Sequence, residues 1–386
     1  MCKYITDTVK NNMKSIIKDC SLPERKAAEE VVRGLLTEGV PILRRLAQDQ
    51  DKTAKKQAEK YSFHLAKTDF TEAVYNLALK HAATEMTEYT IIAYDLSDIA
   101  KESAHEMEKI RRVFDGSKRK ICNGYAFHGV GINHMLIRAE IHDGDKTFLP
   151  QIRKKIVMEI SGKLGDKGVW VVDRGNDDKE FFLFLRSELK VHFIARLKEN
   201  RQVVIIKNGA IIQVKNLKPG QYDVYLMKRN NNGADTDNRY RLVIQNHLEE
   251  KEPIRLLTSL PKKRFSKKRI VEMYLERWGV ENSFKRIKQK FSLEKIRVIK
   301  YRVFLNLIAL TLFAMLMSAL IFQRIQKMNH HFIAEVLLLY KRFIKVKSLS
   351  FNPDSFISFI QSSLPKLLFR AHDPPVQMTL FPSVFQ

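Results

Sequence analysis

The chain has 386 residues, of which 45% are hydrophobic and 29% are charged, so it is globular and long enough for about two or three domains. Its net charge of +25 favours a polyanionic partner, nucleic acid first and an anionic membrane second. The three cysteines form no CxxC pair, which argues against a disulfide framework and a zinc module and suits a reducing cytosol.

The first 85 residues are predicted to form short helices that carry many Lys and Arg side chains. One helix begins near Pro23 and ends before Gly39 and Pro41, and further short helices follow it. Two interpretations stay open for this region: a small DNA-binding domain, or a helical bundle that packs on a catalytic domain. The N-terminus has no apolar stretch of signal-peptide length, which favours a cytoplasmic protein.

Strand-like sequence follows the helical region. The apolar run TEYTIIAYDLSD predicts a buried strand with Asp95 at its C-terminal end. Residues 123–143 alternate between polar and apolar and contain several glycines, which predicts two antiparallel strands.

A second acidic position follows another apolar run. LPQIRKKIVMEISGKL predicts a helix, and GVWVVDRGNDD then predicts a buried strand that ends in Asp173. Asp177 or Asp178 is expected to cap the next helix, DKEFFLFLRSEL, rather than to bind a metal. HFIARLKEN predicts one more strand.

Residues 201–262 predict a β-rich insertion, because they contain several short alternating strands separated by turn-like stretches such as NNNGADTDN. Lys and Arg surround its tyrosines Tyr222, Tyr225 and Tyr240. Such aromatic side chains can stack on nucleic-acid bases, but they are also ordinary strand residues, so both interpretations stay open.

Residues 266–291 predict one long helix with Ser266 as its N-cap. At about 100° per residue, one stripe is apolar and can pack on a core: Met273, Val280, Phe284, Ile287 and Phe291. The neighbouring stripe carries four polar groups: Tyr274, Arg277, Glu281 and Lys288. Either this stripe is a functional edge, or it is a solvated face with an i,i+4 ion pair.

Residues 303–322 are apolar and about as long as a transmembrane helix requires. A helix buried inside a large domain is the favoured interpretation, because no second such segment exists and the basic flanks show no sidedness. Further helices are predicted after it, and the chain ends in a proline-rich, extended tail.

Three carboxylates from distant parts of the chain, Asp95, Asp173 and Glu281, are the kind of ligand set that a hard divalent cation needs. Mg²⁺ and Mn²⁺ prefer oxygen ligands, and a pair of such ions can clamp the attacking and leaving oxygens of a phosphoryl displacement. Periodicity alone leaves open whether the three side chains converge.

The polar stripe also matches a known signature. The spacing Y-(2)-R-(3)-E-(6)-K is that of one group of bacterial insertion-sequence transposases, and this chain carries it at Tyr274, Arg277, Glu281 and Lys288. The contexts AYDLSD around Asp95 and VVDRGNDD around Asp173 resemble the group's catalytic aspartates. The resemblance covers roughly residues 87–325.

The resemblance implies an α/β fold of RNase H type, in which helices flank a mixed sheet and a β-rich insertion interrupts it. The implied organisation, in chain order, is a helical N-terminal region (1–85), the first part of the catalytic domain (86–200), the insertion (201–262), the second part of the catalytic domain (263–330) and a helical C-terminal region with an extended tail (331–386).

The implied activity is that of a DNA transposase that cuts the element ends and transfers the freed strands into target DNA. Asp95, Asp173 and Glu281 are the implied catalytic residues and ligands of a pair of Mg²⁺ or Mn²⁺ ions. Contacts to DNA phosphates are implied for the rest of the signature: Tyr274, Arg277 and Lys288. The alternative is a DNA-binding protein that keeps the fold without the activity, although all three acids are intact.

The implied partners are double-stranded DNA, both terminal inverted repeats and target, and a second copy of the chain in a dimeric complex. No membrane is expected, although a membrane-associated protein built around residues 303–322 is a competing hypothesis. The expected location is the bacterial cytoplasm, with the nucleoid when DNA is bound. The tail resembles the short peptide by which many bacterial proteins bind the replication sliding clamp, through Gln377, Met378, Leu380 and Phe381.

Overall fold

The chain forms two compact units in the computed structural model. The model describes residues 2–47, 52–116, 118–133, 135–143, 148–165, 167–228, 233–247, 252–327 and 353–369. The first unit comprises Met1–Leu77, Glu106–Glu108 and Arg286–Gln386, and the second comprises Ala78–His105 and Lys109–Lys285. This division groups most of residues 263–330 with the N-terminal helices, whereas the sequence places them in the catalytic domain.

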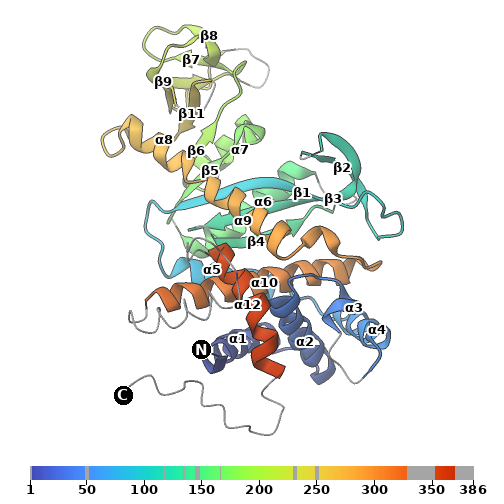
Figure 1. Cartoon of the computed structure of the whole chain (residues 1–386). Coiled ribbons are helices and arrows are strands. Elements are labelled where there is room, and N and C mark those ends of the chain that lie inside the picture. Colours follow the sequence, from blue (N-terminus) through green and yellow to red (C-terminus); the bar gives the residue numbers. More distant parts are fainter. Residues whose placement is uncertain are drawn as a thin grey trace, which may run out of the picture. The chain divides into compact units, whose positions relative to one another are not determined.

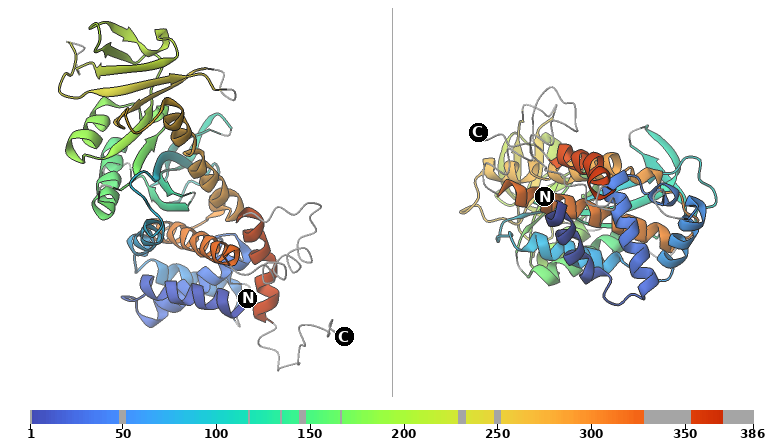
Figure 2. Two further views of the ribbon diagram at one scale, coloured as in Figure 1. Left: turned by 90° about the vertical axis from the view of Figure 1, so that its left-hand side faces the viewer. Right: turned by 60° about the horizontal axis from the view of Figure 1, so that its bottom comes forward.

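The first unit is helical, and the short helices expected near the N-terminus are present (Figure 1). They are α1 (Cys2–Ile16), α2 (Leu22–Glu38), α3 (Leu43–Leu46), α4 (Ala54–Leu65) and α5 (Thr71–Ala83), the last of which continues into the second unit. The apolar segment forms α10 (Tyr301–Gln326), and α1, α2, α4 and α12 (Pro353–Phe369) pack against it (Figure 2).

Helix α10 is the one described helix that is long and apolar enough to cross a membrane, and 83% of its most apolar stretch is buried inside the protein. The core helix of a globular protein meets the same criteria of length and composition, so the helix is weak evidence for a membrane span. Its burial agrees with the predicted interior helix.

One polar side chain in α10 holds the turn between α4 and α5. The Asn306 amide is fully buried and donates to the carbonyl oxygens of Leu65 at 2.7 Å and Thr68 at 2.6 Å. Its Oδ1 accepts a hydrogen bond from the Phe70 N–H at 2.9 Å. Three backbone groups that no helix satisfies therefore depend on one side chain.

We expect Asn306→Leu, which keeps the branched side-chain skeleton but removes all three hydrogen bonds, to lower the free energy of unfolding by about 2–4 kcal/mol, because buried backbone groups lose their partners. Urea unfolding followed by far-UV circular dichroism measures the change. Ser318→Ala is the control, since the Ser318 hydroxyl bonds only the Ala314 carbonyl of its own helix; its cost should stay below about 1 kcal/mol. Equal stability of the two variants would contradict this role of Asn306.

The second unit is built on a mixed sheet of 11 strands, which confirms the predicted α/β class. Its strand order is β2-β3-β1-β5-β6-β11-β10-β9-β7-β8, with β4 paired to β3. The pairs β1–β5 and β5–β6 are parallel and the other pairs are antiparallel. The strands are β1 (Ile91–Ala100), β2 (Arg111–Asp115), β3 (Lys120–Ile132), β4 (Met135–Ile141), β5 (Val169–Val172), β6 (His192–Arg196), β7 (Gln202–Ile205), β8 (Ile211–Gln213), β9 (Gly220–Leu226), β10 (Tyr240–Gln245) and β11 (Ile254–Thr258).

The β-rich insertion is an extension of this sheet. Its last strand, β11, pairs antiparallel with β6, which lies in the predicted HFIARLKEN strand, so β7 to β11 continue the hydrogen-bond ladder of β1, β5 and β6. Of the three insertion tyrosines, Tyr240 is only 2% exposed and belongs to the interior, so it is not available for base stacking in this conformation.

Two boundaries differ from the predicted ones. Strand β1 runs on to Ala100, so Asp95 lies in its middle and not at its end. The physical reason is that β3 remains paired with β1 beyond Asp95. The predicted single helix is two helices, α8 (Lys267–Leu275) and α9 (Trp278–Lys290). The Arg277 N–H bonds the Tyr274 carbonyl, three residues back, which tightens the chain at the break.

Helices cover the two faces of the sheet beside β1. On one face, Trp170 of β5 donates to Ser161 of α6 (Leu149–Leu164) at 3.0 Å. On the other face, α9 packs on β3. A Cβ at Gly129 would lie 2.0 Å from Phe284 of α9, so only glycine permits this approach. The predicted apolar stripe on α8 and α9 is buried as expected: Met273, Val280, Phe284, Ile287 and Phe291.

Candidate active site

The two aspartates lie together because β1 and β5 stop pairing at the same point. The last parallel pair is Tyr94 with Val172. Asp95 is the next residue of β1, and Asp173 directly follows the end of β5. Alternation along β1 places Asp95 on the face of Ala93, which pairs with Gly131 under α9. Both carboxylates therefore lie at one edge of the parallel strands, on the face that α9 covers.

Helix α9 brings the third acid to the same place. Gly129 pairs with Asp95 across β1 and β3, and Phe284 of α9 packs directly on Gly129. Glu281 lies one turn before Phe284 on this helix, and 47% of its side chain is exposed. The close approach of α9 to the glycine face thus places a carboxylate over the aspartate edge.

Arg277 joins two of the three acids. Its Nη1 lies 3.1 Å from Asp95 Oδ2, and its Nη2 lies 2.6 Å from Glu281 Oε1. The guanidinium side chain is 6% exposed and lies at the break between α8 and α9. Burial opposes its charge, but Tyr274, Asp95 and Glu281 outweigh burial, so the pKa of Arg277 is raised and the group stays cationic.

The acids also act on one another. Burial first, and the negative charge of Asp173 second, raise the pKa of Asp95 to about 7, although Arg277 partly offsets the effect. Glu281 adds to the same repulsion. Asp173 and Glu281 are thus close enough to Asp95 to destabilise its negative charge, and the positive charge of Arg277 partly relieves this effect.

The donor set fits a hard divalent cation in chemical type, because it consists of carboxylate oxygens that one cation, the guanidinium, already bridges. Among the described residues, however, no three ligand-type side chains lie as close together as one ion requires. Asp95 and Glu281 bind Arg277, and Asp173 binds an amide. Asp95, Asp173 and Glu281 are the residues that would hold such an ion.

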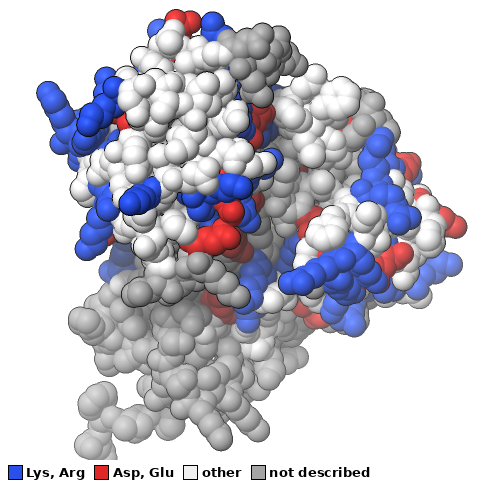
Figure 3. All heavy atoms as spheres, turned by 90° about the horizontal axis from the view of Figure 1, so that it is seen from above, with Lys and Arg blue, Asp and Glu red and all other residues white. Residues whose placement is uncertain are grey.

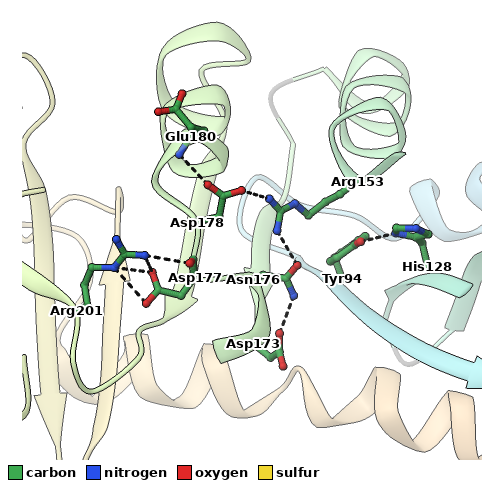
Figure 4. A network of polar contacts seen from close by, with 9 residues as sticks. All are labelled: Tyr94, His128, Arg153, Asp173, Asn176, Asp177, Asp178, Glu180 and Arg201. Atoms are coloured by element: carbon green, nitrogen blue, oxygen red, sulfur yellow. Dashed lines mark hydrogen bonds and ion pairs between the residues drawn. The ribbon is translucent and has the colours of Figure 1, made fainter. Parts of the chain in front are cut away.

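A polar network fixes Asp173 (Figure 4). Its Oδ1 accepts a hydrogen bond of 2.6 Å from Asn176 Nδ2, and Asn176 is buried. Arg153 of α6 donates from Nη1 to Asn176 Oδ1 at 3.0 Å and from Nη2 to Asp178 Oδ2 at 2.5 Å. Because a guanidinium only donates, Arg153 dictates which end of the Asn176 amide faces Asp173.

The acids that follow Asp173 are structural. Asp178 caps α7 (Lys179–Leu183), as one of the two predicted possibilities states, and accepts from the Glu180 N–H at 3.0 Å. Asp177 has a fully buried side chain whose Oδ1 lies 2.7 Å from Arg201 Nη2. Its Oδ2 accepts from the Lys198 N–H at 2.8 Å.

The remaining predicted site residues are Tyr274, Lys288 and the four clamp-peptide residues of the tail. Tyr274 is 1% exposed, and the Arg277 guanidinium lies 5.6 Å from the centre of its ring. Lys288 lies on α9 two turns beyond Glu281, with its Nζ 3.8 Å from Glu294. Their contacts with DNA phosphates stay predictions. The four clamp-peptide residues, Gln377, Met378, Leu380 and Phe381, lie outside the described residues.

Sequence reasoning missed Arg153, Asn176 and Gly129. Asn176 lies three residues after Asp173, a spacing that a turn brings into hydrogen-bond reach, and this was the available signal. Gly129 falls in the glycine-rich strand that the sequence did show, but its role depends on which helix packs there. Arg153 comes from a helix about 20 residues upstream of Asp173, and no local pattern links the two.

The sheet is mixed and flanked by helices. Two aspartates and a glutamate come from β1, the end of β5 and a following helix. This combination defines the RNase H-like class of enzymes that process nucleic-acid strands. Residues 86–317 match the family described as Transposase DDE domain, which is more than half of the chain, and the protein belongs to this family. No curated protein matches the chain significantly. The family implies transposition with nuclease activity on DNA, typically with a divalent metal.

We expect Asn176→Asp to reduce DNA cutting by about 10- to 100-fold, because it replaces the donor to Asp173 by a second carboxylate. Asn176→Ala should fall in the same range. A cleavage assay at fixed metal concentration measures the effect, and thermal melting shows whether each variant folds. Asn238→Ala, which removes an exposed hydrogen bond to Ser187, is the matched control and should cut normally. Full activity of both Asn176 variants would contradict the positioning role.

Proposed function

We propose that the protein is the transposase of an insertion sequence, which cuts DNA at the element ends and joins the freed strands to target DNA. The observation that carries the proposal is that Asp95 and Asp173 lie side by side where the parallel pairing of β1 and β5 ends. Glu281 binds the same guanidinium as Asp95. The net charge of +25 supports a DNA substrate.

The proposed chemistry consists of two displacements at phosphorus. In the first, a water oxygen bonds to the phosphorus at the element end and the bond to the 3′ oxygen breaks, which leaves a free 3′-hydroxyl. In the second, the oxygen of this hydroxyl loses its proton and bonds to a target phosphorus, and the bond from that phosphorus to the target's own 3′ oxygen breaks, so that this oxygen takes up a proton and becomes a free 3′-hydroxyl. When bound, a pair of Mg²⁺ or Mn²⁺ ions supplies activation of the attacking oxygen and stabilisation of the leaving one.

The residues of the chain have separate tasks in this proposal. Asp95, Asp173 and Glu281 provide the oxygen ligands, and Asn176 orients the Asp173 carboxylate. Arg277 compensates the repulsion between the acids and fixes the distance between Asp95 and Glu281. Tyr274, Arg277 and Lys288 are proposed contacts to the DNA backbone. In the conformation described, Tyr274 is buried and Arg277 is bound to carboxylates, so these two contacts require rearrangement around the break between α8 and α9.

The proposed complex contains at least two copies of the chain, because two element ends are cut and joined together. The proposed location is the bacterial cytoplasm, where the DNA is, and this follows from the substrate. Neither the partner copy nor the location is needed for the assignment of the catalytic acids.

We expect Glu281→Gln to reduce cutting by about 10³-fold or more while the protein stays folded, because the amide keeps the shape but removes the charge that holds a cation. The assay uses a duplex that carries the terminal repeat flanking the coding region, with Mg²⁺ or Mn²⁺. Glu276→Gln is the control: Glu276 lies five residues before Glu281, is exposed and pairs only with Arg269 among the described contacts. An active Glu281→Gln protein would refute the assignment of the third acid.

The tail motif adds a proposed partner, the replication sliding clamp. We expect the intact chain to retain purified clamp in a pull-down, and the double variant Gln377→Ala/Phe381→Ala to lose it, because the glutamine and the apolar anchor provide the two ends of the peptide. Failure of the intact chain to bind the clamp would end this proposal and leave the assignment of the catalytic acids unchanged.

A further inference from the structure

The edge of the sheet farthest from the insertion carries a hairpin with an unusual surface. Residues 109–124, here called the β2–β3 arm, contain β2 and the first part of β3. Phe114 and Ile121 pair directly across the two strands, so their side chains share one face. They are 61% and 60% exposed, which places an aromatic and an aliphatic side chain side by side in solvent.

The arm is also strongly basic. It holds one acidic residue, Asp115, and six basic ones: Lys109, Arg111, Arg112, Lys118, Arg119 and Lys120. Glu102 pairs with Lys118 at 2.6 Å and with Lys120 at 3.0 Å, so part of this charge is compensated. Figure 3 shows Lys and Arg gathered on the right-hand side, where Figure 1 draws β2.

Protection of the edge strand against pairing with other chains explains the basic residues of the arm but not its exposed apolar pair. β2 is the last strand of the ladder, and charged residues on such strands prevent pairing with other chains. An exposed apolar pair has the opposite effect, because it favours association. The combination of cations with an exposed pair of one aromatic and one aliphatic side chain instead matches the surface of DNA, where phosphates flank the apolar faces of sugars and bases.

The turn of the arm supports the same view. Arg119 has a φ of 51°, a conformation that glycine or asparagine adopts more readily than arginine. Either of those residues would relieve the strain but would remove a positive charge from the tip. The turn therefore keeps a charge at the expense of backbone strain, as binding segments do.

A recess beside the arm continues the basic surface. Its volume is about 450 Å³, and Arg111, Arg112, His142 and Phe148 are among the residues that line it. Phe148 is 75% exposed, so a second aromatic side chain lies at this recess. Basic and aromatic residues therefore line a recess directly beside the arm.

The arm lies within reach of DNA held at the catalytic acids. β3 is one continuous strand from the tip pair at Ile121 to Gly129, which pairs with Asp95. Eight residues of strand span at most roughly 26 Å, at about 3.3 Å per residue. This is shorter than one turn of B-form DNA, about 34 Å, so a duplex at the acids can also contact the arm.

We propose that the β2–β3 arm binds target DNA, with Arg112 and Arg119 on phosphates and with Phe114 and Ile121 against a groove. Cations and apolar side chains at a hairpin tip position DNA without requiring a sequence, which suits a target more than a terminal repeat. The inference rests on the proposed function, since it presumes that the protein joins element DNA to a target.

The salt dependence of DNA binding distinguishes the contacts of the arginines with phosphates from the contacts of the apolar side chains. With a duplex of unrelated sequence and the full chain, Arg112→Gln/Arg119→Gln should weaken binding and reduce the slope of log K against log salt by about 2, because two phosphate contacts are lost. Phe114→Ala/Ile121→Ala should weaken binding by about tenfold at an unchanged slope. Fluorescence anisotropy over a range of salt concentrations measures both.

The controls have the same chemistry elsewhere in the second unit. Lys167→Gln removes an exposed charge, and Ile211→Ala removes a 56% exposed side chain of β8 at the far end of the sheet. Both should bind as the unaltered chain does, and thermal melting should show all variants folded because every altered side chain is exposed. Arm variants that match these controls in affinity and slope would overturn the proposal.

A second assay distinguishes target from element end. With pre-cut element ends, arm variants should lose more strand transfer than they lose end cutting on uncut substrate. A greater loss of end cutting would assign the arm to the element end and overturn the target assignment. If the unaltered chain neither cuts nor transfers, the proposed function fails, whereas the salt experiment still tests DNA binding by the arm.

Discussion

The site depends on a buried cation between two acids. Arg277 has a 6% exposed side chain and bonds both Asp95 and Glu281, so it links the middle of β1 to the first turn of α9. Without positive charge at this point, burial and the neighbouring Asp173 would favour the protonated form of Asp95, whose pKa is already raised to about 7. The spacing of four residues from Arg277 to Glu281 therefore has a physical basis, because it lets one guanidinium bond the first turn of α9 while it also reaches Asp95 on the sheet.

This bridge is possible only because α9 lies unusually close to β3. Gly129 and Gly131 present no side chains to the helix, and Phe284 and Val280 fill the space that a Cβ would need. Gly129 pairs with Asp95, so this close approach of helix and sheet occurs beside one of the three candidate acids. A larger residue at either glycine would push α9 away and lengthen the contact of Arg277 with Asp95. The glycine pattern of β3 thus sets the geometry of residues that are about 150 positions later in the chain.

The sequence was sufficient wherever the signal was local. The apolar run before Asp173 predicted the strand β5, and the periodicity of α8 and α9 predicted the buried stripe, whereas the set of three acids came from the resemblance and not from periodicity. The sequence did not predict the strand ends, helix breaks and contacts that depend on residues far away in the chain. β1 continues past Asp95 because β3 stays paired with it, and the helix breaks before Trp278 where Arg277 turns toward a strand 182 residues away. The contact of Arg153 with Asn176 belongs to the same class, since it joins a helix to a turn that only the folded sheet brings together.

The turn after Asp173 also connects the strands that carry the candidate acids to the insertion. Asn176 faces Asp173 on one side, while the neighbouring Asp177 binds Arg201, the residue directly before β7. Asp177 is fully buried and accepts from both the Arg201 side chain and the Lys198 backbone, so its position is fixed by the segment that leads into the insertion. Because Asn176 and Asp177 are adjacent, displacement of that segment would move the donor that orients Asp173. An insertion joined to the sheet only through a flexible loop would have no such connection, whereas this insertion pairs with β6 and its leading segment bonds Asp177 in the turn after Asp173.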